Sequence, residues 1–390
     1  SPMREKAITA HAFSGYFAFG YSVLVFSALI PAIEKTLNLT HAHIGTALSL
    51  GAVGFFVASI LYGILLERFE AFIVILSGWG IFLLGNLLLG LASSYSFLLI
   101  GTIMLNFGSG SVEVTIPFTL SMKSGSKGKT LNLSHSAFAL GALAGPAFTS
   151  SLMKTLGNWR WAFISSLFFS TLPLIFLLKG RVFLRDAHSH YLLNEERVFL
   201  RGLLNKIYIL LLLVLSMYVG YEMGFSTWLS VFLHEAKDYP IPLASLYPSF
   251  LWLGLFLGRL FCASAADRVG YGRWLNLVVA FSLVFSTITV AVARKPLFIM
   301  LSVFLTGFWY ATTYPTIQAM IVAMLRGGKA IGLSIAAAST SAFSALASFV
   351  IGQIGTRFGI FYGVLVILLF NVLALTIALA LSMMKNREHF

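Results

Sequence analysis

The sequence predicts an all-α membrane protein with twelve transmembrane helices, arranged as two six-helix bundles. Three observations carry this prediction. Of the 390 residues, 58% are hydrophobic and only 10% are charged, apolar stretches recur along the whole chain, and one polar segment divides them into two equal sets. A soluble domain is roughly a quarter charged. The apolar surface of this chain therefore requires lipid as its solvent.

Each apolar stretch is long enough to cross the hydrocarbon core of a bilayer, which takes roughly 20 residues per helix. The expected spans are 7–33, 41–66, 71–92, 95–122, 130–154, 158–179, 206–233, 242–266, 272–292, 296–324, 329–354 and 359–384. The polar segment 180–205 contains several Arg, Glu and His residues. It is the expected cytoplasmic linker between an N-terminal bundle, residues 1–179, and a C-terminal bundle, residues 206–390.

The basic residues are distributed unevenly between the loops, and their distribution explains the net charge of +13. Eighteen of the 26 Lys and Arg residues lie in the two terminal segments and in the loops on the same side as those segments. Cytoplasmic loops carry such an excess, which places both termini in the cytoplasm. A chain charged in this way is expected in the cell membrane, plasma or bacterial or archaeal inner, in contact with lipid and without a nucleic-acid partner.

Landmarks in the first six spans return in the last six after an almost constant interval of 198 to 200 residues. They are Glu67-Arg68 with Asp267-Arg268, Pro117 with Pro315, and Gly157 with Gly355. Parallel repeats joined by a central linker are the layout of the major facilitator superfamily, in which the substrate site lies near the midplane between the halves. The two acid-arginine pairs resemble that family's loop signature, although Glu67 replaces the usual Asp and Glu70 stands where glycine is usual.

Away from the ends of the predicted spans, three charged residues lie inside them, namely Glu113, Glu222 and Arg259. Each costs several kcal/mol to bury unless it is paired, hydrated or neutralised. Burial favours the protonated form of a carboxyl group, so both acids are candidates for proton coupling. For Arg259 we favour a structural pair with Asp267, two turns further along the same helix. Together with Glu67, Arg68 and Arg268, these two residues are the expected gating set.

A narrower resemblance rests on the seventh span, the run from Leu131 to Pro146 followed by Gly157-Asn-Trp159-Arg160, and the segment from Glu113 to Pro117. These segments resemble the fucose permease-like branch, the fucose-galactose-glucose:proton symporters. The resemblance implies that Glu113, four residues before a proline, binds substrate and couples it to protons. The first-helix aspartate of that branch falls on Ser27, four residues before Pro31, which leaves one acid of the pair.

Sugars are bound by aromatic faces together with amide, hydroxyl and carboxylate groups. The candidate substrate-binding residues of this type within the spans are Tyr21, Ser27, Asn106, Asn132, His135, Tyr221, Trp228, Trp309, Tyr314 and Gln318. Tyr221, Glu222, Phe225 and Trp228 recur at helical spacing, so we expect their side chains to share one face of the seventh span. Packing or a bond to neighbouring backbone is the competing explanation for each of these residues.

The predicted function is secondary active transport of a monosaccharide or related polar solute by a monomer, through proton-coupled alternating access, with sodium as the alternative coupling ion. An exporter of drugs, lipids or other amphiphiles is the alternative, favoured by the 36 phenylalanines. A third class is a membrane receptor or scaffold that transports nothing. Such a protein would have no need of a protonatable acid beside flexible Gly-Pro sites in its helices. No metal-spaced His/Cys cluster, P-loop or nucleophile elbow occurs in the sequence. We therefore expect no enzyme activity, cofactor or metal.

Overall fold

A computed structural model describes residues 2–121, 127–191, 204–262, 264–324 and 329–385. Twelve helical spans in these residues are long and apolar enough to cross a membrane, as predicted. The elements are α1 (Pro2–Leu37), α2 (His41–Arg68), α3 (Ala71–Gly90), α4 (Tyr95–Ser121), α5 (Lys127–Leu156), α6 (Arg160–Tyr191), α8 (Lys206–Lys237), α9 (Ile241–Ala244), α10 (Tyr247–Phe261), α11 (Ala265–Val269), α12 (Tyr271–Thr287), the π-helical turn η1 (Ile288–Val292), α13 (Pro296–Tyr310), α14 (Thr313–Met324), α15 (Lys329–Phe358) and α16 (Ile360–Lys385).

Local sequence explains where several helices begin and end. Thr40 caps α2 and forms a reciprocal capping box with His43, which satisfies backbone donors that the first turn leaves free. Pro296 starts α13, where its missing N–H costs nothing. Asp238 ends α8 in the left-handed conformation, with φ of 58°. Short turns of this kind bring consecutive spans back alongside one another.

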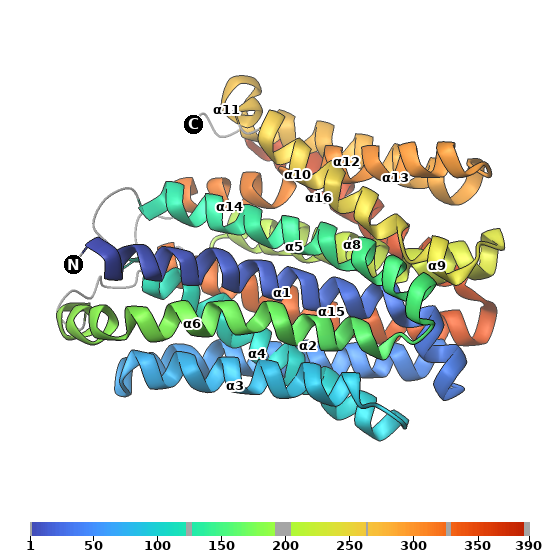
Figure 1. Ribbon diagram of the computed structural model, residues 1–390. Coiled ribbons are helices and arrows are strands. Elements are labelled where there is room, and N and C mark those ends of the chain that lie inside the picture. The colour runs from blue at the N-terminus through green and yellow to red at the C-terminus, as the bar shows by residue number, and fades with distance from the viewer. Residues whose placement is uncertain (1, 122–126, 192–203, 263, 325–328, 386–390) are drawn as a thin grey trace.

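The first six long helices and the remaining long helices pack in the same pattern (Figure 1). In the first set, α1 packs against α5 and α6, while α4 packs against α2 and α3. In the second set, α8 packs against α15 and α16, while α13 packs against α10 and α12. We call these sets the first half and the second half. The halves meet where α1 packs against α8, α2 against α15, and α5 against α10.

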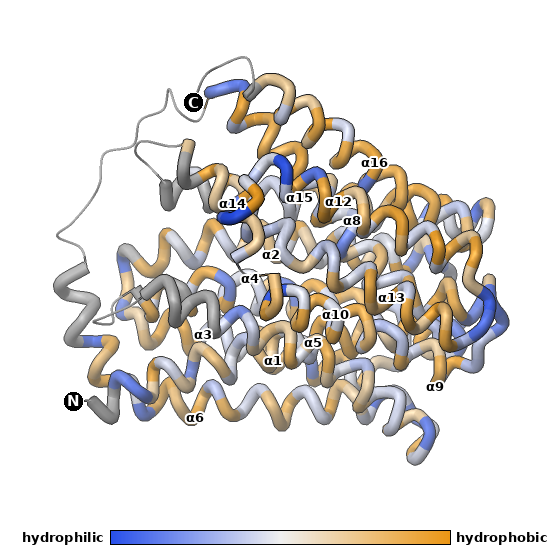
Figure 2. Tube along the Cα trace, turned by 90° about the horizontal axis from the view of Figure 1, so that it is seen from above, coloured by the Kyte–Doolittle hydropathy of each residue, from blue (hydrophilic) through white to orange (hydrophobic). Residues whose placement is uncertain are grey.

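The helices are largely hydrophobic along their length (Figure 2), and many of their large apolar side chains are exposed on the outside of the molecule. Large exposed examples include Ile100, Phe168, Leu178, Leu301 and Leu369. A soluble monomer rarely exposes contiguous apolar surface on this scale. The exposed surface therefore faces the hydrocarbon of a bilayer, and the protein is a multi-pass membrane protein.

The beginning of α1 and the end of α16 lie at the same end of the molecule (Figure 1). We call this the inner end and the opposite one the outer end. Hydrogen bonds between the halves gather in the outer part of the described structure, and most of them run from hydroxyl groups to backbone carbonyl oxygens. Five of them are Ser230 Oγ to Ser27 O (3.0 Å), Ser245 Oγ to Ala28 O (2.7 Å), Ser150 Oγ to Pro242 O (2.6 Å), Ser249 Oγ to Leu143 O (2.8 Å) and Ala42 N to Thr356 Oγ1 (2.6 Å). A sixth joins the side chains of His41 and Glu235 at 2.9 Å. The halves are thus joined at the outer end.

Two glycines allow α2 and α15 to touch at this outer end. A Cβ atom added to Gly45 would lie 2.6 Å from Ser348 O and 2.8 Å from the Cα of Gly352. A Cβ added to Gly352 would lie 2.6 Å from His41 O. Small residues let helix backbones approach in this way. The outer closure therefore depends on the absence of side chains at this crossing.

Candidate functional site

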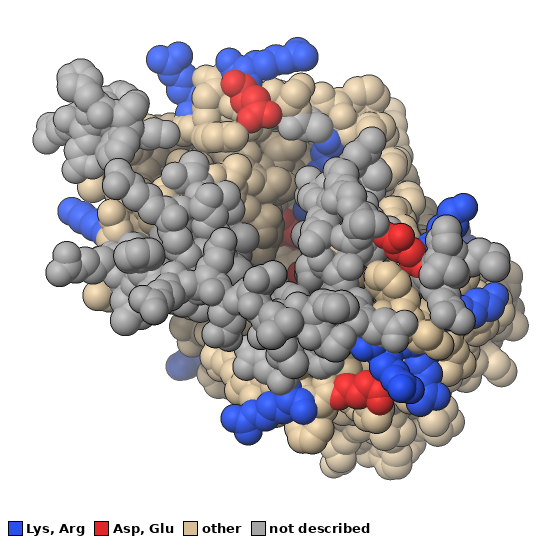
Figure 3. Space-filling view, turned by 90° about the vertical axis from the view of Figure 1, so that its left-hand side faces the viewer, with Lys and Arg blue, Asp and Glu red and all other residues tan. Residues whose placement is uncertain are grey.

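A cavity of about 1050 Å³ lies between the two halves. The cavity extends from Asp267 and Tyr271, which belong to the inner end, to Ser27 of α1 and Glu113 of α4 in the interior. Figure 3 looks onto the inner end, where the surface is hollowed near its centre and Lys and Arg side chains lie mostly around the edge of the face. Since the halves are hydrogen-bonded in their outer part, the structure is open at the inner end and closed at the outer end.

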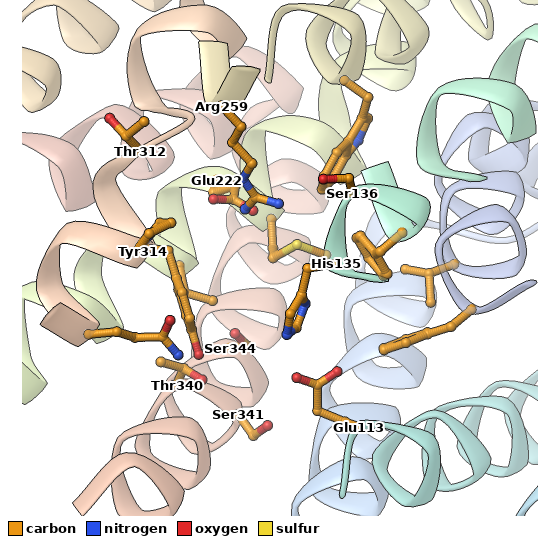
Figure 4. A pocket seen from close by; sticks show the side chains of 18 of the residues that line it. Glu113, His135, Ser136, Glu222, Arg259, Thr312, Tyr314, Thr340, Ser341 and Ser344 are labelled. Atoms are coloured by element: carbon orange, nitrogen blue, oxygen red, sulfur yellow. The ribbon is translucent and has the colours of Figure 1, made fainter. Parts of the chain in front are cut away.

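Glu113 projects into this cavity from α4, close to His135 of α5 (Figure 4). No hydrogen bond or ion pair joins the Glu113 carboxyl group to another residue in the part of the chain that the structure describes. The His135 ring packs on Tyr16, with ring centroids 4.6 Å apart. A carboxyl group without a partner in such a place is costly to ionise. It is therefore chemically suited to bind a proton or a substrate hydroxyl.

Arg259 and Glu222 line the cavity opposite Glu113 (Figure 4). The Glu222 carboxylate accepts a hydrogen bond from the Tyr218 hydroxyl group, which comes from the preceding turn of α8. The Nε atom of Arg259 donates to Ala311 O at 3.2 Å. That carbonyl is free because Pro315, four residues later, has no N–H.

The expected pair of Arg259 with Asp267 is absent from the described structure, and this prediction was wrong. The Asp267 carboxylate accepts from the Tyr271 hydroxyl group at 2.8 Å instead. The helix that was predicted to continue through both residues ends at Phe261, and Asp267 belongs to the separate short helix α11. The arginine is therefore available to the cavity.

One wall of the cavity is polar and comes largely from α15. Its hydroxyl groups belong to Thr340, Ser341, Ser344 and Ser348, and three of these positions recur at helical spacing. Sequence reasoning missed this row, although the Ser-rich pattern from 339 to 348 displays it. The side chains of Asn106 and Gln318 add amide groups, and those of Thr312 and Thr316 add hydroxyl groups. This wall offers the hydrogen-bonding partners that a polyhydroxylated solute requires.

Another part of the lining is apolar and aromatic. It contains Phe19 and Phe26 of α1, Phe55 of α2 and Phe138 of α5. Trp252 of α10 also lines the cavity and packs edge-on against Phe138, with ring centroids 5.6 Å apart. Its Nε1 donates to Ser226 Oγ at 2.9 Å, which fixes the orientation of the indole ring. Trp252 is thus the tryptophan placed to contact a solute.

The structure brings five of the ten predicted substrate-binding residues into the cavity lining, namely Ser27, Asn106, His135, Tyr314 and Gln318. Both residues predicted for proton coupling, Glu113 and Glu222, line the cavity as well. Asn132 lies in α5, but its side chain is outside the described residues. The remaining four are aromatic residues that lie elsewhere.

These four residues, Tyr21, Tyr221, Trp228 and Trp309, were predicted to bind substrate, and their rings are packed outside the cavity lining. The Tyr21 hydroxyl group is hydrogen-bonded to Ser165 Oγ at 2.7 Å, and that of Tyr221 donates to Ser282 O at 3.0 Å. Trp309 stacks on Phe281, with centroids 4.6 Å apart. Trp228 is buried at the outer end beside His41. In each case a residue of a neighbouring helix supplies the hydrogen bond or the ring contact that holds the side chain away from the cavity.

The acid-arginine pairs lie at the inner ends of α2 and α11. Arg68 and Arg268 are both exposed, and no ion pair joins them to described residues. The side chain of Glu67 lies outside the described residues. Their predicted gating role remains a prediction. Of the three whose side chains the structure describes, Asp267 lines the cavity.

Comparisons with known proteins agree with this architecture. The family model of the Major Facilitator Superfamily matches residues 12–293. The glucose/mannose transporter GlcP of Bacillus subtilis (strain 168) is 22% identical over 360 residues, which span 90% of this chain and 88% of that protein. The crystal structure of a D-xylose-proton symporter superposes with a TM-score of 0.77 at 14% identity, covering 96% of both chains. The nucleoside transporter NupG (D323A mutant) gives 0.72 at 14% identity, covering 97% of this chain and 99% of that one.

The fold and the central cavity define a membrane transporter rather than an enzyme. The family match extends over more than half of the chain. The protein belongs to the major facilitator superfamily, and its predicted fold class is confirmed.

Proposed function

We propose that this protein is a secondary active transporter that carries a monosaccharide or a related polar solute by proton-coupled alternating access. The observation that carries the proposal is the Glu113 carboxyl group, which faces the cavity and has no hydrogen-bond or ion-pair partner among the described residues. The wall of hydroxyl and amide groups across the cavity supports a hydroxylated solute. The similarity to a glucose/mannose transporter over most of both chains supports the same substrate class.

In the proposed cycle, Glu113 binds a proton before the halves rock. Its charged form is costly in an apolar cavity, whereas the neutral form allows the cavity to close around the solute. The hydroxyl groups of α15 and the amides of Asn106 and Gln318 bind the hydroxyl groups of the solute, and Trp252 packs against its C–H face. With Ser27 in place of a second acid, this pair of positions carries at most one proton per cycle.

With the inner end in the cytoplasm, as the loop charges predict, the structure corresponds to an inward-facing state. A proton and solute that entered from outside would then leave through the hollow at the inner end. The solute passes the side chains of α11 on this route, since Asp267 lines the cavity. The two-sided polarity of the cavity matches a sugar, which has hydroxyl groups at its rim and C–H groups on its faces.

The test uses purified protein in proteoliposomes. We expect Glu113→Gln to exchange labelled sugar between equal concentrations, because the amide imitates the protonated acid, but to fail to accumulate sugar under an inward proton gradient. The wild type should do both. Accumulation by Glu113→Gln would overturn the coupling role. Loss of accumulation in Glu222→Gln alone would transfer that role to Glu222.

Export of amphiphiles is the second candidate, and the phenylalanine-rich wall from α1, α2 and α5 favours it. A thermal-shift screen separates the two functions, because a ligand that binds only the folded state raises its apparent stability. Stabilisation by monosaccharides and not by amphiphiles supports the proposed function. The reverse result supports the exporter.

A further inference from the structure

A histidine at the outer end bridges two carboxylates that come from different halves of the molecule. The Nδ1 atom of His41 lies 2.7 Å from Glu34 Oε1, and its Nε2 atom lies 2.9 Å from Glu235 Oε2. Glu34 and His41 belong to α1 and α2 of the first half, and Glu235 belongs to α8 of the second. These are the ion pairs found among the described residues.

The His41 ring sits in a slot formed by the second half. Trp228 of α8 meets it edge-on, with ring centroids 5.8 Å apart. On the other side, a Cβ atom added to Gly355 of α15 would lie 3.3 Å from the ring. The next residue, Ala42, donates its N–H to Thr356 Oγ1 at 2.6 Å. His41 is therefore fixed where α2, α8 and α15 meet.

The three side chains differ in their access to water. The side chains of His41 and Glu34 are 10% and 9% exposed, whereas that of Glu235 is 40% exposed. Protons can therefore exchange with the outer medium through Glu235. Glu235, whose bond to His41 joins the two halves, is thus the carboxylate in contact with the outer medium.

Few other titratable groups act on this cluster. His234 of α8 lies near Glu34, and its own Nδ1 is bonded to Tyr239 O at 2.7 Å. Lys35 of α1 is exposed. Arg357 of α15 is exposed and lies over the Phe358 ring. None of these three forms an ion pair with the cluster. The protonation of the cluster is thus decided mainly among its own members.

Counting protons shows what the geometry requires. A neutral imidazole has one N–H, and its other nitrogen only accepts. Two bonds from one ring to two carboxyl groups need one more proton, either on the ring or on a carboxyl oxygen. When that proton leaves, a ring nitrogen lone pair faces a carboxylate and the bond is lost. Since Glu34 is buried with His41 in the same half, the bond to Glu235 is the one that yields.

The same three residue types could also ligate zinc. Zinc bound between a nitrogen and an oxygen at about 2.0 Å from each would hold them roughly 3.3 Å apart in tetrahedral geometry. The observed separations of 2.7 and 2.9 Å are those of charge-assisted hydrogen bonds. The geometry fits a proton better than a metal ion.

We propose that Glu34, His41 and Glu235 form a proton-binding site, separate from the cavity, that holds the outer ends of the two halves together while its proton is bound. Acid at the outer face thereby favours the outer-closed form, and alkaline medium releases the His41–Glu235 bond and favours outer opening. The site does not depend on Glu113 and does not require a sugar substrate.

The experiment measures the separation of the halves at the outer end in full-length protein in lipid nanodiscs. Cys262, the one cysteine of the chain, is replaced by alanine. Spin labels are then attached through Lys154→Cys in the first half and Lys295→Cys in the second, both at exposed positions near outer helix ends. Distances between the labels are recorded from about pH 5 to about pH 10.5, a range that extends well above the titration of a free imidazole. We expect the long-distance population to grow as the pH rises.

Three substitutions assign this response. His41→Gln should abolish the pH dependence. The matched control is His43→Gln, because His43 is exposed and bonded only within the Thr40 capping box, and glutamine is a regular member of that box. It should retain the wild-type response. Glu235→Gln should stay outer-closed at every pH, because an amide can donate to a bare ring nitrogen or accept from an N–H.

A pH response that survives in both His41→Gln and Glu235→Gln would overturn the proposal. Recording the same distances in Glu113→Gln separates this site from the proposed coupling group. The response should persist in Glu113→Gln even if that variant loses sugar accumulation. Its disappearance there, with retention in His41→Gln, would also overturn the proposal.

Discussion

The Nε atom of Arg259 donates a hydrogen bond to the carbonyl oxygen of Ala311 at 3.2 Å. Ala311 lies between α13 and α14, at the position that corresponds by the repeat to Glu113. Pro315 leaves this carbonyl without its helical donor. The first half thus has an acidic side chain, Glu113, at this position of the repeat. The second half has a break between two helices there, and the free carbonyl oxygen of Ala311 orients the Arg259 guanidinium toward the cavity.

This relationship predicts that Arg259 and Pro315 are energetically coupled. Arg259→Leu removes the donor and should destabilise the protein by about 1–3 kcal/mol, the cost of an unsatisfied buried carbonyl. Adding Pro315→Ala supplies a backbone N–H that can bond Ala311 O, so the double variant should be more stable than Arg259→Leu. Denaturant unfolding in detergent measures both changes. If the losses of stability caused by Arg259→Leu and Pro315→Ala simply add in the double variant, the two residues do not act through the carbonyl of Ala311.

The close contact of Gly45 with Gly352 predicts that added bulk opens the outer end. Gly45→Ala would bring a Cβ within 2.6 Å of Ser348 O, so the helices must separate and the inner end must close in compensation. We expect the alkylation of Cys262, which lines the cavity toward the inner end, to slow at fixed pH. Gly63→Ala on the same helix is the control, because nothing lies within 4 Å of its added Cβ. Equal rates in both variants would contradict the prediction.

Trp252 should contribute to sugar binding through its ring face. We expect Trp252→Ala to weaken sugar binding by about tenfold, equivalent to ~1.4 kcal/mol, and Trp252→Phe to weaken it less because a ring remains. Equilibrium binding of labelled sugar to the purified protein measures both. Trp309→Ala, which alters the stack with Phe281 outside the cavity lining, should bind as the wild type does. Equal losses in the two Trp252 variants would exclude stacking.

The hydroxyl row of α15 should distinguish polar from apolar solutes. Ser344→Ala removes one hydrogen-bonding group, and a neutral hydrogen bond contributes about 0.5–1.5 kcal/mol. Sugar affinity should therefore fall by roughly two- to tenfold, while an amphiphile that binds the phenylalanine wall should be unaffected. Competition binding with each ligand class measures this. An unchanged sugar affinity together with weaker amphiphile binding would contradict the assigned wall.

The positions of the spans could be predicted because each apolar run is a local signal. A stretch such as 296–324 identifies a membrane helix whatever it packs against, and the structure places a span at Pro296–Ile321. Acids inside a span are equally local, which is why Glu113 was recognised and lies in the cavity. Both predictions follow from the cost of placing a residue in lipid.

Which face of a helix borders the cavity could not be predicted in the same way. Trp228 and Tyr221 share a face of α8 with other aromatic residues. The lipid side and the protein side of a membrane helix are both apolar, so the spacing does not show which of them this face borders. The pairing of His41 with Glu235 joins residues 194 positions apart. Each lies near a helix end, where charged groups are ordinary, so only their juxtaposition in three dimensions reveals them. The division of the chain at 180–205 and the cytoplasmic position of the termini remain predictions.

The outer closure also bears on how freely this protein can change in evolution. At Ser27 and Ala28 the second half binds main-chain oxygens rather than side chains. Every amino acid supplies such an oxygen, so these hydrogen bonds do not depend on which side chain stands at position 27. A related protein could carry an acid instead of serine at position 27, with a different coupling ion or substrate, and keep the hydrogen bonds that close the outer end.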